Sequence, residues 1–317
     1  MFKNYLLTAY RNFRINKVIS LIHISGLAIG ISAALVIFLI VYYEYSFDKF
    51  EPGRDKIFRV VLDANFNGTE GHSAAVPAPM GGAIANEITG VDLTVPVFQF
   101  PGDGMAKVSV ASSKSDNPVV YKNQKDIVFT NSEYFQLLPF KWITGSSKTS
   151  LNNPFSIVLT ESRAHQYFPL LPLNAIPGRQ ITYNDDLHVT VSGIVKDLKE
   201  NTSFSGQEFI SLPTIINTNL KDRFMMTVWN DWMAYSHLYI KLAKGSSIEG
   251  TELKIKSMYA KYNMNEKNDS WKSVRFRLQP LNDIHFNSKY PGFGQRVAHK
   301  PTLYGLLAVA AFLLLLG

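Results

Sequence analysis

The hydrophobic pattern of the chain is dominated by one long apolar run, from Val18 to Tyr43. These 26 residues include no Lys, Arg, Asp or Glu, and about 20 apolar residues in a helix cross the ~30 Å hydrocarbon core of a bilayer. The run is too long for the apolar core of a cleavable signal peptide, and no small-residue cleavage site follows it. It therefore predicts a transmembrane helix over residues 18–43.

A second apolar run closes the chain, from Leu303 to Gly317 after Pro301. As a helix it would reach only about 22 Å, which is short of a full crossing. It has no polar face with which to lie flat on a membrane surface. We therefore expect residues 301–317 to begin a second transmembrane helix, and the chain to be the N-terminal part of a longer protein.

Charge around the first run predicts its orientation, because Lys and Arg mark the cytoplasmic side of a span. The residues after it are mainly acidic, whereas the seventeen residues before it contain no acidic residue and four basic ones: Lys3, Arg11, Arg14 and Lys17. The N-terminus is thus expected in the cytoplasm, and residues 44–300 outside. Residues 1–17 also show helical apolar spacing, which fits an amphipathic helix on lipid or a simple topology-setting flank.

Residues 44–300 mix strand and helix patterns. Two β-α-β units lie far apart in the chain, and we expect them to form one sheet with helices on one face. The first comprises Ile57–Leu62, Ala78–Ile88 and Val91–Phe100, and the second Ser236–Leu242, Ile248–Tyr262 and Ser273–Leu278.

The region between the two units is rich in predicted strands. They are Ile127–Thr130, Ser156–Thr160, Gln180–Tyr183 and His188–Val195, and Asp185-Asp186 is read as a hairpin turn between the last two. The fold class is therefore an α+β extracytoplasmic domain with a strand-rich inserted subdomain, flanked by transmembrane helices.

Composition excludes some classes of function and of structural site. The formal net charge is +7, of which +4 comes from the first seventeen residues, and the remainder has 28 basic and 25 acidic residues. The outer region is therefore nearly balanced, and the charge gives no reason to expect nucleic acid as a partner. The chain has no cysteine, which excludes disulfides and thiolate metal ligands.

Motifs for chemistry are missing from the sequence. It contains no GxxxxGK[ST] phosphate loop, no HExxH zinc pattern and no GxSxG nucleophile elbow. His165 and His237 are read as structural residues of a helix and a strand. We therefore predict no catalytic residue, no cofactor and no metal, and we do not expect the chain to be an enzyme.

Two further patterns suggest packing. Gly26 and Gly30 form a GxxxG within the first apolar run, a pattern that lets a partner helix approach closely but also arises by chance. Trp229, Trp232 and Tyr235 cluster in one short segment, where core packing is favoured over a ligand-facing aromatic patch.

Several motifs, in order along the chain, resemble the MacB/FtsX-type ABC transporter permease subunits, especially those of Bacteroidetes. They are the opening FKNYLLTAYRNFRINKVISLIHISGLAIG, then EYSFDKFEPGRDKIFRVV, SIVLTESRAHQYFP with the GRQIT strand, VSGIVKDLKENTSF, and LQPLNDIHFNS. The fourth contains the residues that we single out as a family-like periplasmic motif: Gly193, Val195, Asp197, Asn201, Ser203 and Phe204.

The resemblance implies a mechanotransmitter in the bacterial inner membrane with a periplasmic domain of two subdomains. The "Porter" would cover about 52–104 and 221–285, and the "Sabre" about 105–220. The implied partners are membrane lipid, a cytoplasmic ABC ATPase that hydrolyses ATP, a second permease copy or paralogue, and a periplasmic adaptor or substrate protein.

Two other functions stay open on the same topology. A membrane-anchored extracytoplasmic sensor would also place a ligand domain between two spans. A regulator of cell-wall hydrolases, in the manner of FtsX, would share the fold but act on a hydrolase partner. Fold alone does not choose among these functions or name a substrate.

Overall fold

The fold was analysed in a computed structural model of the chain, which describes residues 5, 10–11, 14–51, 53–66, 68–111, 117–263, 271–293 and 296–316. The chain divides into two compact units. One comprises residues 1–47 with 298–317, and the other comprises residues 48–297.

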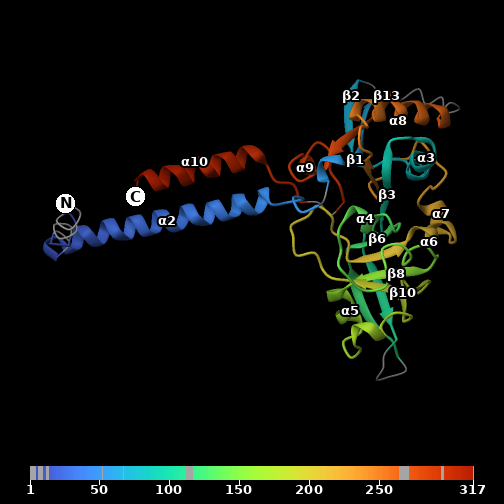
Figure 1. The fold of residues 1–317 in the computed structure, drawn as a ribbon, viewed down its shortest axis with the longest axis horizontal. Coiled ribbons are helices and arrows are strands. Elements are labelled where there is room, and N and C mark those ends of the chain that lie inside the picture. The colour runs from blue at the N-terminus through green and yellow to red at the C-terminus, as the bar shows by residue number, and fades with distance from the viewer. Residues whose placement is uncertain are drawn as a thin grey trace. The chain divides into compact units, whose positions relative to one another are not determined.

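The first unit is built from two apolar helices that pack side by side, α2 (Lys17–Tyr45) and α10 (Lys300–Leu316) (Figure 1). Among the described residues, α2 is the one helix that is both long and apolar enough to cross a membrane, and its mean hydropathy reaches 2.7. Most of its large apolar side chains are exposed, as expected of a helix that meets lipid rather than a protein core. The structure thus has a helix over the predicted residues 18–43, and its passage through a membrane stays a prediction.

The second unit contains one mixed sheet that runs its whole length. In spatial order its main path is β13-β1-β12-β3-β6-β11-β8-β10-β9-β4-β5, with β2 paired to β1 and β7 paired to β10. Most neighbouring strands are antiparallel, whereas β6–β11 and β8–β10 are parallel.

The two predicted β-α-β units lie together at one end of this sheet (Figure 1). Helices α3 and α8 pack beside each other over buried side chains of β1, β12 and β13, including Leu62, Ile240 and Phe276. The expected shared sheet is therefore confirmed. Its elements are β1 (Ile57–Phe66), α3 (Met80–Glu87), β3 (Val91–Gln99), β12 (Ser236–Leu242), α8 (Ile248–Tyr262) and β13 (Trp271–Pro280).

The sheet continues through the strand-rich region. The four predicted strands are confirmed as β6 (Ile127–Thr130), β8 (Ser156–Thr160), β9 (Gln180–Tyr183) and β10 (Leu187–Val195). Five strands were not predicted: β2 (Thr69–Ser73), β4 (Ala106–Val110), β5 (Val119–Gln124), β7 (Trp142–Thr144) and β11 (Glu208–Ser211). Because both regions share one sheet and one compact unit, the Porter and Sabre limits remain predictions.

The predicted turn between β9 and β10 is confirmed. Asn184 and Asp185 both have positive φ, at 46° and 68°, as the two central residues of a type I′ hairpin turn require. The remaining short helices lie before the first strand, between strands or after the last strand. They are η1 (Arg54–Lys56), α4 (Tyr134–Leu137), α5 (Glu161–Tyr167), η2 (Leu173–Ala175), α6 (Leu212–Ile216), α7 (Leu220–Arg223) and α9 (Leu281–Ile284).

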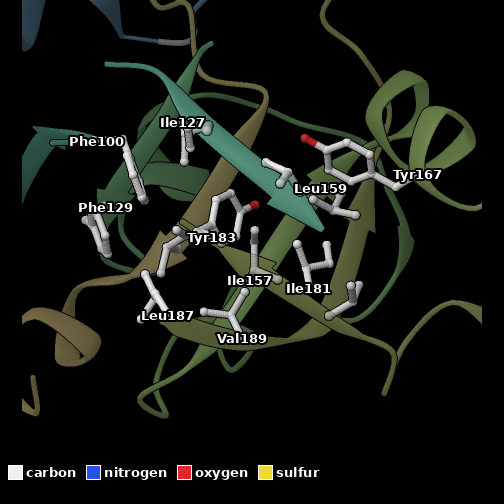
Figure 2. Close-up of a cluster of buried hydrophobic side chains, with 14 of the residues drawn as sticks. Phe100, Ile127, Phe129, Ile157, Leu159, Tyr167, Ile181, Tyr183, Leu187 and Val189 are labelled. Atoms are coloured by element: carbon white, nitrogen blue, oxygen red, sulfur yellow. The ribbon is translucent and has the colours of Figure 1, made fainter. Parts of the chain in front are cut away.

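A second core fills the strand-rich region, and Figure 2 shows it from close by. Ile157, Ile181 and Val189 pack there between the strands and α5, together with the ring of Tyr183. The only carboxylate in this core, among the described residues, is that of Glu208. It pairs with Arg163 at 2.9 Å and accepts hydrogen bonds from the Tyr167 and Tyr183 hydroxyls, so its charge is balanced where it lies.

The aromatic segment before β12 packs against the sheet, as favoured from the sequence. Trp229 and Trp232 lie against the core beneath α3 and α8. The Trp229 ring also stacks on that of Tyr262 with the centroids 4.4 Å apart. The apolar surface of this aromatic segment is therefore packed against other residues of the domain.

Candidate functional site

The domain begins with a carboxylate that is held by the family-like motif. Asp48 is the first residue of the second unit, and only 1% of it is exposed. Its backbone N–H donates to the carbonyl of Asn201 at 2.9 Å. Its Oδ1 accepts from the Thr202 hydroxyl and the Ser203 N–H, both at 2.8 Å, and its Oδ2 accepts from the Ser203 hydroxyl at 2.5 Å. We call this arrangement of Asp48 with residues 201–203 the Asp48 clasp.

Backbone conformation explains why a short polar residue stands at this position. Asp48 has a φ of 54°, a left-handed conformation that Asp tolerates better than most residues because its side chain can bond to nearby backbone. Burial raises the pKa of the Asp48 carboxyl, and the hydrogen bonds from Ser203 and Thr202 act against that rise. The clasp therefore supplies the polar partners that a buried carboxylate needs.

An aromatic contact connects the clasp to the sheet. Phe204 follows the clasp directly, and its ring lies 4.6 Å from that of Tyr239 on β12, measured between centroids. Tyr239 stands opposite Arg59 in the β1–β12 register. The motif loop is thus packed onto the central strands and does not hang free in solvent.

A second buried network secures the last segment of the domain. Arg59 on β1 is fully buried and donates through Nε and Nη2 to Oε1 of Gln279, at 3.1 and 2.7 Å, and through Nη2 to the carbonyl of Tyr290 at 2.9 Å. Gln279 in turn donates to Asp283 at 3.0 Å. Burial lowers the pKa of the Arg59 guanidinium. Residues 279–290 are therefore tied to the strand that follows the clasp.

A second carboxylate lies in the segment after the clasp without a hydrogen bond. Glu51 is 3% exposed, and neither of its carboxylate oxygens has a hydrogen-bond partner among the described residues. Burial, followed by the charge of Asp48, raises the pKa of Glu51 to about 7, and the backbone N–H of Glu51, the nearby Thr202 hydroxyl and the charge of Arg54 offset the rise only in part. Glu51 therefore changes its charge near neutral pH, whereas an ordinary Glu does so well below it.

The rest of the family-like motif has structural contacts elsewhere. Asp197 accepts hydrogen bonds from the backbone N–H of Ser162 at 2.9 Å and from its hydroxyl at 2.5 Å, so it holds the first turn of α5 to the end of β10. Gly193 is crowded, because a Cβ there would lie 2.8 Å from the Trp142 ring. Val195 is buried in the core. Of these six motif residues, Asn201 and Ser203 thus belong to the clasp, and Phe204 directly follows it.

The residues singled out near the membrane lie in the first unit. Gly30 faces α10, where a Cβ would lie 3.3 Å from the carbonyl of Leu313, whereas Gly26 has no atom within 4 Å of that position. Of the four basic residues, Lys3 lies outside the described residues, and Arg11, Arg14 and Lys17 are exposed.

The polar groups of these networks bind segments of the domain to one another. The carboxylates and the guanidinium of the clasp and the Arg59 network are buried and largely engaged with protein partners. Among the described residues, no group of three or more His, Cys, Asp or Glu side chains is placed to hold a metal ion.

Comparison with known proteins identifies the family of this chain. The profile of the MacB-like periplasmic core domain matches residues 20–258. The chain belongs to the MacB-like periplasmic core domain family. The family match includes α2, the Asp48 clasp and most of the sheet, and it confirms the resemblance seen in the sequence. The α/β domain described above is the fold of this family.

A solved structure shows the same fold. A crystallised domain of a proposed permease protein from Porphyromonas gingivalis is similar with a TM-score of 0.57 and 18% identity, over 82% of this chain and 99% of that one. The periplasmic region of MacB from Actinobacillus actinomycetemcomitans aligns with a TM-score of 0.43 and 12% identity, over 68% of this chain and 87% of that one. No curated protein matches the sequence.

Several residues of the candidate site were not singled out from the sequence. Asp48, Glu51, Arg59 and Gln279 each lie within a quoted motif, EYSFDKFEPGRDKIFRVV or LQPLNDIHFNS. The signal was a charged or amide residue inside an otherwise strand-like or aromatic stretch, since such a residue needs a buried partner.

Proposed function

We propose that this chain is the membrane subunit of a MacB-type ABC transporter, which passes the motion of a cytoplasmic ATPase to the domain of residues 48–297. The observation that carries the proposal is the Asp48 clasp. It locks the first residue after the α2 unit into a loop on the sheet of a MacB-like periplasmic core domain.

Tight attachment is what mechanical transmission needs. Close-packed interiors are hardly compressible and pass displacement on rather than absorbing it. A pull on residue 48 would be carried by its four hydrogen bonds to residues 201–203 and by the Phe204–Tyr239 contact to β12. The Arg59 network would do the same for the segment that leads to α10.

The proposal includes a location and partners. The protein would lie in the bacterial inner membrane with its N-terminus in the cytoplasm and its main domain in the periplasm. It would pair with a second copy or a paralogue and with an ABC ATPase, and it would meet an adaptor or substrate protein outside. Lipid would surround α2.

The decisive experiment is purification of the tagged, full-length protein from its native membranes in mild detergent. We expect an ATPase with a Walker A motif to co-purify in stoichiometric amount. Recovery of a signalling protein in its place would favour the sensor, and recovery of a cell-wall hydrolase would favour the FtsX-like regulator. Either result without an ATPase would overturn the transporter.

Coupling can then be tested in the reconstituted complex. Asp48→Ala should keep the ATPase bound but remove most of the transport that depends on ATP. Asp55→Ala is the matched control, because Asp55 lies seven residues later with its side chain 86% exposed. Equal transport by the two variants would show that the clasp does not transmit motion.

A further inference from the structure

One face of the β2–β1–β13 ribbon concentrates charge. In the strand register Asp63 stands opposite His72 on one side and Arg275 on the other. Arg277 follows two residues after Arg275 and therefore points to the same face of β13. The other face of the ribbon is apolar and forms the core beneath α3 and α8, so the charged face is free of that packing.

This face is hollowed. A cavity of about 360 Å³ is lined by both arms of the β1–β2 hairpin, by Arg275 and Arg277, and by Lys289 from the segment after α9. Its volume lies at the lower end of the range for small-molecule sites. It has room for an anionic group together with part of the molecule that carries it.

The Asp63 carboxylate that lines the cavity already has its partners. Asp63 Oδ1 accepts from the Tyr290 hydroxyl at 2.8 Å and lies 2.7 Å from His72 Nδ1. Partial burial acts to raise the pKa of Asp63, but the hydrogen bonds from Tyr290 and His72 and the charge of Lys289 hold it below its usual value. Asp63 therefore stays ionised and positions the groups around it.

The cations around Asp63 are only loosely paired. Arg277 Nε lies 3.6 Å from Asp63 Oδ2, its Nη1 lies 3.4 Å from Glu252, and Lys289 Nζ lies 3.8 Å from Asp63 Oδ1. Arg275 is exposed and has no ion pair among the described residues. These three permanent cations line a cavity whose other carboxylate, Glu70, is exposed on β2.

We propose that this cavity is a binding site for a phosphate-bearing ligand, held by Arg275, Arg277 and Lys289. Three cations, two on β13 and one in the segment after α9, suit the several oxygens of a phosphate, and Arg presents paired N–H donors to such groups. Ser273 on the same face of β13 adds a hydroxyl donor. The inference does not depend on the proposed transport function.

The test is a calorimetric titration of the full-length protein in a nonionic detergent. The probes are inorganic phosphate and a short-chain phosphatidylglycerol, with a nonionic detergent monomer of equal chain length as blank. Arg275→Gln is the test variant, because this exposed side chain can be changed without disturbing the core. Arg223→Gln is the matched control, since Arg223 is exposed on α7 and distant in sequence from the cavity.

We expect saturable binding to the wild-type protein and to Arg223→Gln. Binding to Arg275→Gln should be weaker by about tenfold or more, since a charge-assisted contact is lost. A response to inorganic phosphate would point to a soluble phosphate compound, and a response to phosphatidylglycerol alone would point to a lipid headgroup. Both support the site. Absence of binding to either probe, or equal binding by the two Arg variants, would overturn it.

A second variant separates a ligand site from a structural cluster. Asp63→Asn removes the negative charge but keeps an acceptor for Tyr290 and His72. If the cavity binds phosphate, this change should tighten binding by about three- to tenfold, because a like charge is removed. A folded Asp63→Asn protein whose phosphate affinity is unchanged would argue that the cluster only stabilises the hairpin.

Discussion

At the scale of single residues, Asp48 and Glu51 show how surroundings assign different roles to two carboxylates three positions apart. Asp48 accepts three hydrogen bonds from Thr202 and Ser203 and is anchored by them. Glu51 is buried with no such partner among the described residues, and its pKa is raised to about 7. The first carboxylate therefore serves as the acceptor that Thr202 and Ser203 need, and the second opposes folding when it is charged.

Loss of the Asp48 carboxylate should be costly for stability. Asp48→Ala leaves the Ser203 N–H and two hydroxyls without their acceptor in a buried place, and we expect the free energy of unfolding to fall by about 2–4 kcal/mol. Asp48→Asn keeps an acceptor and tolerates the positive φ, so it should lose less. Denaturant unfolding of the detergent-solubilised protein measures both, and equal losses would contradict the hydrogen-bond explanation.

Glu51 should make stability depend on pH near neutrality. The folded state holds the Glu51 proton between its ordinary pKa of 4.5 and about 7, so it binds more protons than the unfolded state there, and stability falls as pH rises through this range. Glu51→Gln should remove this fall and raise the free energy of unfolding at pH 8 by about 1–2 kcal/mol, allowing for solvent screening. If the free energy of unfolding depended on pH in the same way in the wild-type protein and in Glu51→Gln, this prediction would be contradicted.

At the scale of elements, α3 shows how one helix combines a packed face with an open one. A Cβ at Gly81 would lie 3.3 Å from both Leu238 and Pro96, whereas a Cβ at Gly82 would meet nothing within 4 Å. Gly81 thus lets the helix lie close to β3 and β12. Gly82 gives no such benefit and still carries the entropic cost of glycine in a helix.

The two glycines form a matched pair for a stability test. Gly82→Ala should raise the free energy of unfolding by about 0.5–1 kcal/mol, because alanine is the better helix former. Gly81→Ala gains the same propensity but must displace its neighbours, and it should therefore be less stable than Gly82→Ala. Thermal unfolding of the two variants measures the difference, and the opposite order would show that α3 is not held closely against the sheet.

Elements with strong local patterns could be predicted from the sequence, and those defined by distant partners could not. β12 and α8 have the predicted limits because a short run rich in strand-favouring residues marks the first and helical spacing marks the second. β11 has four buried residues without alternation, and it becomes a strand by parallel pairing with β6 about eighty residues earlier. The Asp48 clasp was missed for the same reason, since it joins residues about 155 positions apart.

At the scale of the whole molecule, family membership and the apolar α2 together indicate a membrane-anchored protein, and the chain is well suited to a test of its topology. The 317 residues contain no cysteine, so any single cysteine introduced among them is the only thiol in this part of the protein. The excess of Lys and Arg before α2 predicts a cytoplasmic N-terminus. The domain of residues 48–297 would then lie on the opposite side of the membrane.

Two positions suit this test because both are exposed and lie outside the apolar helices: Tyr10 in the N-terminal segment and Lys148 in a turn between β7 and β8. In intact spheroplasts a membrane-impermeant maleimide should label Lys148→Cys at once, and should label Tyr10→Cys only after permeabilisation. Labelling in the reverse order would place the domain in the cytoplasm. Because the proposed transporter places this domain outside the inner membrane, that outcome would remove the basis for the proposal, whereas the expected order supports it independently of any substrate.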